Sequence, residues 1–131
     1  MLLQPLGPGG RLSYRRAVFD YRIDSEVDAP IEVAQPAAVL LFDGVFLQCC
    51  ELRSHWDLII WVDAPFEVTV ERAIARDSSG KSEIGRLHRL YERRYVPGQR
   101  IYMDRCEPRK RAHVVVDNSD YSDPRLEIRN V

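Results

Sequence analysis

The sequence has no long hydrophobic run and only a few cysteines. Its longest apolar stretches, residues 37–42 and 58–62, are far too short to cross a membrane, so we expect no membrane partner. Three cysteines, two of them adjacent, do not make a disulfide framework and indicate a reducing compartment. Residues 1–10 show no basic stretch followed by an apolar one, so we expect no secretory leader. These absences predict a cytoplasmic protein.

A disordered chain is also excluded, because 45% of the 131 residues are hydrophobic and 30% are charged. This length predicts one small domain. The net charge of −1 hides an uneven distribution. Residues 17–71 hold eleven acidic residues and two arginines, whereas residues 72–111 hold twelve lysines and arginines against five acidic residues. Such a basic stretch is typical both of phosphate binding and of an ordinary solvated helical surface, and composition does not choose between them.

Three short, mostly apolar runs without alternation predict the strands of a parallel sheet, at residues 37–43, 57–63 and 112–117. Apolar stripes at helical spacing predict helices at residues 65–77, 82–95 and 99–106. We expect Pro97 and Gly98 to separate the last two helices. Residues 1–36 lack clear periodicity and predict an irregular leading segment with one β-prone piece at 17–21. Alternating strands and helices predict an α/β fold whose sheet carries helices on both faces.

Each predicted strand ends in an aspartate, and ligands of open parallel sheets bind beyond the carboxyl ends of the strands. Asp43 follows an apolar run and precedes a glycine, which matches the Walker B carboxylate that holds Mg²⁺. The alternative is an ordinary turn at the end of a strand. Asp63 precedes Ala64 and Pro65, and we expect it to cap the following helix. Asp117 precedes an asparagine, and we expect it to be a turn residue.

The arginines of the basic stretch fall into two sets, each on one helical face: Arg72 with Arg76, and Arg86 with Arg89 and Arg93. Residues 78–82 between the sets are small, polar and flexible. Two basic helices joined by such a loop could close as a lid over a polyphosphate. We therefore expect Arg76, Arg86 and Arg89 to bind a nucleotide. The alternative is that the arginines pair on the surface with neighbouring carboxylates, those of Glu67, Glu71, Asp77 and Glu92.

Residues 75–82 read A-R-D-S-S-G-K-S, which is close to the P-loop signature but has alanine at the first glycine position. A true P-loop follows a buried strand, because the loop must bend so that successive backbone N–H groups surround the phosphate. Residues 68–77 instead predict an amphipathic helix, so we interpret the match as chance.

Four segments of the chain occur in an order known from one enzyme family: VLLFDGVFL (39–47), DLIIWVDAPFEVTVERAIARD (57–77), YERRYVPGQRIY (91–102) and RAHVVVDN (111–118). Together they resemble the uridine kinases, in particular the bacterial uridine-kinase-like group of P-loop nucleoside kinases. The segments PLGPGG (5–10) and YRRAVFDYR (14–22) fit the same group. The resemblance therefore extends over nearly the whole chain.

The resemblance implies transfer of the γ-phosphate of ATP, with Mg²⁺, to the 5′-hydroxyl of a nucleoside. Asp43 matches the acidic residue near the metal, and is the expected metal ligand and a catalytic residue. Arg72 matches an arginine that approaches the nucleoside or phosphate, and Arg76 one that contacts the ATP phosphates and assists catalysis. Phe19 and Asp24 fall where the family contacts the nucleoside.

Relatives also carry a strand, a GxxxxGK[ST] loop and a helix, followed by a strand with a catalytic aspartate, and this sequence lacks all of them. We therefore expect the C-terminal part of such a domain: an incomplete P-loop kinase-type parallel sheet with flanking helices, without its central strand. We expect residues 37–43 to pair directly with residues 57–63, and exposed sheet edges to favour self-association. Without the P-loop, the chain alone is expected to be inactive.

An alternative from another class is a non-catalytic nucleotide-binding, phosphate-binding or interaction module that uses the basic surface of residues 72–93. Such a module would bind phosphate without transferring it. Nucleic acid is not the expected partner, because aromatic residues do not interleave with the basic ones as a single-strand platform requires.

Overall fold

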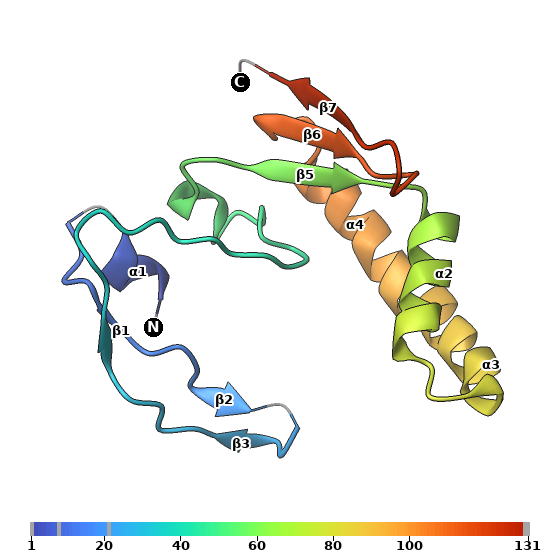
Figure 1. Ribbon diagram of the computed structural model, residues 1–131, viewed down its shortest axis with the longest axis horizontal. Coiled ribbons are helices and arrows are strands. Elements are labelled where there is room, and N and C mark those ends of the chain that lie inside the picture. The colour runs from blue at the N-terminus through green and yellow to red at the C-terminus, as the bar shows by residue number, and fades with distance from the viewer. Residues whose placement is uncertain (1, 8, 21, 130–131) are drawn as a thin grey trace. The chain divides into compact units, whose positions relative to one another are not determined.

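A computed structural model of the chain describes residues 2–7, 9–20 and 22–129. The chain divides into two compact units, Met1–Gly44 and Val45–Val131, and each is described by itself (Figure 1). Both units contain strands and helices, so the chain is a mixed α/β protein. None of the described helices is long and apolar enough to span a membrane.

The first unit consists of short elements joined by turns. It contains α1 (Leu3–Leu6) and two antiparallel two-residue pairs, which are β1 (Ser13–Tyr14) with β4 (Glu32–Val33) and β2 (Phe19–Asp20) with β3 (Ser25–Glu26). No described side chain of this unit is buried. Pairs of this length are marginal in water without a packed face, so this unit has local order but no core.

The predicted strand at residues 37–43 is absent, and its predicted pairing with residues 57–63 is therefore wrong. The segment is irregular, and it is solvent-exposed throughout, with Val39 83% and Leu41 90% exposed. A buried parallel strand needs neighbours on both edges and helices over both faces. Within the described residues of its own unit the segment has no paired strand, so an apolar run that is typical of a central strand is irregular.

The second unit is built on a three-stranded mixed sheet in the order β5–β6–β7 (Figure 1). β5 (Ile60–Asp63) and β6 (Val114–Asp117) pair in parallel, which confirms two of the predicted strands in shortened form. β7 (Arg125–Ile128) pairs antiparallel with β6 and was not predicted. The sheet is thus only partly parallel.

Helices follow β5. α2 (Phe66–Asp77) confirms the predicted helix, and the short loop after it leads into α3 (Lys81–Leu90). A π-helical turn (Tyr91–Tyr95) then joins α3 to α4 (Val96–Cys106), so the predicted interruption at Pro97 and Gly98 is wrong. Pro97 lacks the N–H of a regular helical bond, and the wider π turn lets the helix continue through it. The Val96 N–H, for instance, bonds to the Tyr91 carbonyl, five residues back.

The core of the chain lies in the second unit. Its buried apolar side chains include Ile74, Leu87, Tyr102, Ala112 and Val115, and Pro108 after α4 is buried as well. The first five come from α2, α3, α4, β6 and the residue pair just before β6. A 3₁₀ turn (Arg53–His55) and the residues before it complete the unit on the N-terminal side of β5.

The two faces of the sheet differ. Val115 of the central strand is 2% exposed on one face, and Arg109, which follows α4, bonds to Asp63 at the end of β5. The opposite face carries paired apolar residues that water reaches, including Ile60, Val62, Leu126 and Ile128, each at least 56% exposed. The prediction of a sheet covered on both faces is therefore wrong for the described residues.

Candidate functional site

The carboxyl ends of β5 and β6 bring two of the predicted aspartates together, because Asp63 and Asp117 are register partners. Asp63 accepts hydrogen bonds from Trp61 Nε1 at 3.1 Å and from Arg109 Nε at 2.9 Å. The predicted helix cap is wrong, since the residue before α2 is Pro65 and no side chain caps this helix. Asp63 instead fixes the segment after α4 against the end of the sheet.

Asp117 is the last residue of β6 and not a turn residue, so that prediction is wrong, although its side chain bonds to the chain two residues further on. Its Oδ1 accepts hydrogen bonds from the Ser119 amide at 3.0 Å and from the Ser119 hydroxyl at 2.6 Å. These two bonds, the hydroxyl's first, lower the pKa of Asp117 below its ordinary value. The carboxylate is therefore already occupied in shaping the chain beyond β6.

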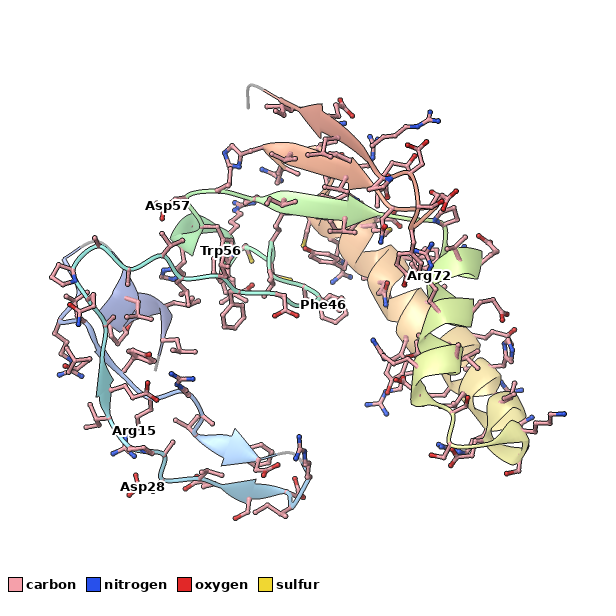
Figure 2. All side chains as sticks on the ribbon, viewed as in Figure 1. Arg15, Asp28, Phe46, Trp56, Asp57 and Arg72 are labelled. Atoms are coloured by element: carbon pink, nitrogen blue, oxygen red, sulfur yellow. The ribbon has the colours of Figure 1, made fainter. Side chains whose placement is uncertain are left out.

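Arg72 connects α2 to the segment just after β6 (Figure 2). Its Nη1 donates to the Asn118 carbonyl at 2.7 Å and its Nη2 to the Ser119 carbonyl at 2.8 Å. The guanidinium also lies over the ring of Tyr121, with Cζ 3.6 Å from the ring centre, a cation–π contact. Two of its donors are thus bound to the backbone, which positions α2 and leaves the remaining N–H groups for other partners.

Arg76 lies one helical turn further, in a small polar cluster. Its Nε and Nη2 donate to the two carboxylate oxygens of Asp77 at 2.7 and 3.2 Å, and the Tyr91 hydroxyl donates to Asp77 Oδ2 at 2.9 Å. The Arg76 bond, and then the Tyr91 bond, lower the pKa of Asp77. The pairing of an arginine with Asp77, one of the alternatives from the sequence, is confirmed.

The Arg76 side chain is 75% exposed and borders a hollow of about 220 Å³. Thr69, Tyr91 and Gln99 also line this hollow, so α2, the π turn and α4 contribute to it together. The Tyr91 hydroxyl donates to Asp77 and the Thr69 hydroxyl to the Phe66 carbonyl, so the Arg76 guanidinium and the Gln99 amide are the groups at this hollow that could bind anionic oxygen atoms. Tyr91 and Gln99 were not among the predicted site residues.

Arg86 and Arg89 lie exposed on α3. Arg86 makes a loose pair with Glu83 at 3.7 Å, and its side chain is 63% exposed. Of the predicted lid, the described residues thus include two helices, a short connection and the exposed arginines Arg76, Arg86 and Arg89. Arg86 and Arg89 are accessible to an anion, whereas Arg76 is held by Asp77 and would have to leave it first.

The connection between the helices is not a phosphate cradle. The Ser79 amide donates to Glu83 Oε2 at 3.0 Å, and this bond is the main cause of the lowered pKa of Glu83. A carboxylate therefore occupies the amide that a P-loop would offer to phosphate. The preceding residues form α2, so the interpretation of the 75–82 motif as chance is confirmed.

Phe19, Asp24 and Asp43 belong to the first unit, whereas the arginines belong to the second. Phe19 lies on β2 and is 51% exposed. Asp24 has φ of 50° in the turn between β2 and β3, a conformation that aspartate tolerates better than most residues. Asp43 lies exposed in the irregular stretch before Gly44.

A larger hollow of about 580 Å³ adjoins the first, since Phe66, Val70 and Val96 line both, and it was not predicted. Phe66, Val70 and Pro97 contribute apolar surface, and acidic side chains, among them Glu71, lie around it. His88 approaches Glu71 at 3.8 Å. The spacing of Phe66 and Val70, one helical turn apart, is the sequence signal that could have indicated this surface.

No protein family, curated protein or solved structure matches the chain.

Within residues 2–7, 9–20 and 22–129, no three histidine, cysteine, aspartate or glutamate side chains come together as a metal site. Mg²⁺ in nucleotide enzymes is commonly held by one or two carboxylates together with phosphates and water. A single carboxylate such as that of Asp43 fits this requirement only when a nucleotide supplies further oxygen ligands.

Proposed function

We propose that this chain is the lid-bearing part of an ATP-dependent nucleoside kinase of the P-loop class. The observation that carries the proposal is the position of β5. Its apolar sequence is typical of a central strand, yet among the described strands it pairs only with β6, and its Ile60 and Val62 are 56% and 59% exposed. In the uridine kinases, which the chain resembles, the P-loop strand lies beside the strand that β5 matches. The proposal therefore expects one edge of β5 to be free.

The connectivity supports the same proposal. β5 and β6 are parallel strands joined through helices, and their carboxyl ends, where ligands of such sheets bind, carry Asp63 and Asp117. Arg72 holds α2 to this edge by two backbone bonds, while Arg76 stays exposed. The anchored arginine positions the helix, and the exposed one is available for phosphate.

Arg76, Arg86 and Arg89 are the residues that we assign to the phosphates of the nucleotide. Arg76 would exchange its bonds to Asp77 for bonds to phosphate oxygen atoms, which carry more charge. Asp43 would hold Mg²⁺ through its carboxylate. Phe19 and Asp24 would contact the nucleoside. When bound, ATP would supply the phosphoryl group and Mg²⁺ would neutralise the charge that develops on it.

We expect this chain to bind a nucleotide but to transfer its phosphoryl group very slowly or not at all. The described loop between α2 and α3 does not cradle phosphate, and the sequence contains no P-loop after a strand. Most of the electrostatic stabilisation of phosphoryl transfer is therefore missing. A purely phosphate-binding module, the second candidate, rests on the same exposed arginines and differs only in what the complete protein does with ATP.

The first experiment is a calorimetric titration of the whole chain with ATP and Mg²⁺, comparing wild type, Arg76→Gln and Arg105→Gln. Arg105 is an exposed arginine of α4 and serves as the control for loss of one charge. We expect Arg76→Gln to weaken ATP binding about five-fold or more, and Arg105→Gln to weaken it less than about two-fold. If the two substitutions weakened ATP binding equally, the assignment of Arg76 to the phosphates would be contradicted.

The second experiment separates the two candidate functions. Transfer of the γ-phosphate is followed with a panel of nucleosides, and we expect a rate far below the roughly 1–100 s⁻¹ of complete kinases. Slow, stoichiometric transfer to one nucleoside would favour the kinase part over the binding module. Turnover at about 1 s⁻¹ would contradict our account of the missing stabilisation.

A further inference from the structure

Two half-buried cysteines lie side by side in the second unit. Cys49 and Cys106 are 57 positions apart, yet their Sγ atoms are 3.9 Å apart, in the geometry of a weak S–H···S hydrogen bond. Cys50, the third cysteine, is exposed. An S–S bond is about 2.05 Å long, so the two sulfur atoms, now 3.9 Å apart, have to approach by about 1.9 Å to be joined.

The segments on both sides of this pair are held by other contacts. The backbone N–H of Gln48 donates to the Tyr102 hydroxyl at 3.1 Å, and the side-chain Nε2 of Gln48 donates to the Pro108 carbonyl at 3.1 Å. The rings of Phe46 and Tyr102 meet edge to face, with centres 5.2 Å apart. Because these bonds surround the thiols, the two sulfur atoms stay close without a covalent link.

We propose that Cys49 and Cys106 form a reversible intramolecular disulfide by exchange with a low-molecular-weight disulfide such as oxidised glutathione. One protein thiolate attacks the glutathione disulfide, forms a mixed disulfide and releases one glutathione. The second protein thiol then loses its proton and attacks the protein sulfur of the mixed disulfide, which releases the second glutathione. Two protein thiols lose two electrons and two protons, and one glutathione disulfide becomes two thiols.

The surroundings of Cys49 determine when this reaction proceeds. Burial, and next the bond with Cys106, raise the pKa of the Cys49 thiol. A thiol with a raised pKa carries little thiolate at neutral pH, so the pair stays reduced for longer than an exposed reactive cysteine would. We expect the rate of disulfide formation to increase as the pH rises from 7 to 9.

The disulfide would close the chain from the segment before β5 to the end of α4. This loop contains β5, α2 and α3, and therefore Arg72 and Arg76. Closing a long loop restricts the unfolded chain and raises the midpoint of unfolding. Oxidation would thus stabilise the unit that carries the exposed arginines.

The test uses the full chain, reduced, freed of reductant and incubated with oxidised glutathione. A tryptic peptide carries Cys49 and Cys50 together, so the mapping is done on Cys50→Ser and Cys49→Ser. In Cys50→Ser we expect a peptide linked to the one that begins at Cys106, a mass two units below the reduced chain, and a higher urea midpoint. In Cys49→Ser the link should form at least ten-fold more slowly.

Two results would overturn the proposal. One is equally fast linkage in the two variants, because it would mean that proximity of Cys49 to Cys106 does not direct the reaction. The other is a Cys50→Ser chain that gives only glutathione adducts or intermolecular dimers. Cys106→Ser serves as a second check, since it should give no intramolecular link to Cys49 and no increase of the urea midpoint on oxidation.

Discussion

The two units of this chain differ in the interactions that stabilise them. In Val45–Val131 side chains such as Val115 and Tyr102 are almost fully buried, and helices and sheet share one core. In Met1–Gly44 no described side chain is buried, and two-residue strand pairs are accompanied by surface ion pairs such as Arg15 with Asp28 (Figure 2). Exposed ion pairs contribute little, so stability must be concentrated in the second unit.

The comparison also shows where apolar sequence is left without cover. The first unit exposes Val39 and Leu41, and the second exposes one face of its sheet, including Ile60 and Ile128. Isolated exposed apolar residues are ordinary, but a continuous strip over three paired strands is a surface that another segment or chain commonly covers. The proposal that this chain is part of a nucleoside kinase gives a reason for this strip, because further elements of that domain would cover it.

The largest effect should come from the core of the second unit. Val115→Ala removes two buried methyl groups, and we expect it to lower the free energy of unfolding by about 2 kcal/mol. The matched substitution Val33→Ala, at a valine that is 71% exposed in the first unit, should cost less than about 0.5 kcal/mol. Urea unfolding followed by far-UV circular dichroism measures both, because each unit contains helices and strands. Equal losses of unfolding free energy in the two variants would contradict the conclusion that stability is concentrated in the second unit.

A smaller effect should come from the arginine that anchors α2. Arg72→Met removes two charge-assisted bonds to carbonyls and the contact with Tyr121, and because the site is partly exposed we expect a loss of about 1–2 kcal/mol. Arg105→Met, at an exposed position of α4, should change the free energy of unfolding by less than about 0.5 kcal/mol. The same urea experiment distinguishes them. An Arg72 variant as stable as the control would show that these bonds do not hold the helix.

The smallest effect should come from the ion pairs of the first unit. Bonds from Arg16, and a further one from Tyr14, lower the pKa of Glu32 below its reference value of 4.5. A lowered carboxyl pKa stabilises the fold above pH 4.5, and this contribution is lost as the pH falls through the folded-state value. Arg16→Gln should therefore raise the pKa of Glu32 toward 4.5, with Arg11→Gln as the control. Carboxyl NMR titration measures this change, and an unaltered pKa would mean that the pair is not formed in solution.

The sequence alone predicted the elements whose local and tertiary signals agree. β5, α2 and β6 combine apolar runs or stripes with flanking polar residues, and each is present. β7 was missed because its four residues, R-L-E-I, alternate too briefly to distinguish a strand from a tail. The segment 37–43 shows the opposite error, since its composition is that of a buried strand but the described structure contains no neighbour for it.

The site was predicted in part for a related reason. The spacing of Arg72 and Arg76 placed both on one helical face, but not their different roles, which depend on the turn after β6 and on Asp77. Tyr91, the residue directly after α3, donates to Asp77 at the end of α2, 14 positions earlier. Contacts between segments far apart in the chain decide these roles, and periodicity does not reveal them.

The central claim is that the exposed arginines of α2 and α3 bind the phosphates of a nucleotide. Its most direct test is a titration of ¹⁵N-labelled full chain with ATP and Mg²⁺, followed by amide and arginine side-chain NMR signals. The account predicts concentration-dependent shifts of the signals of Arg76, Arg86 and Arg89, with adenosine alone producing little change at these arginines. It would be contradicted if these arginine signals stayed fixed at saturating ATP, or if adenosine shifted them equally.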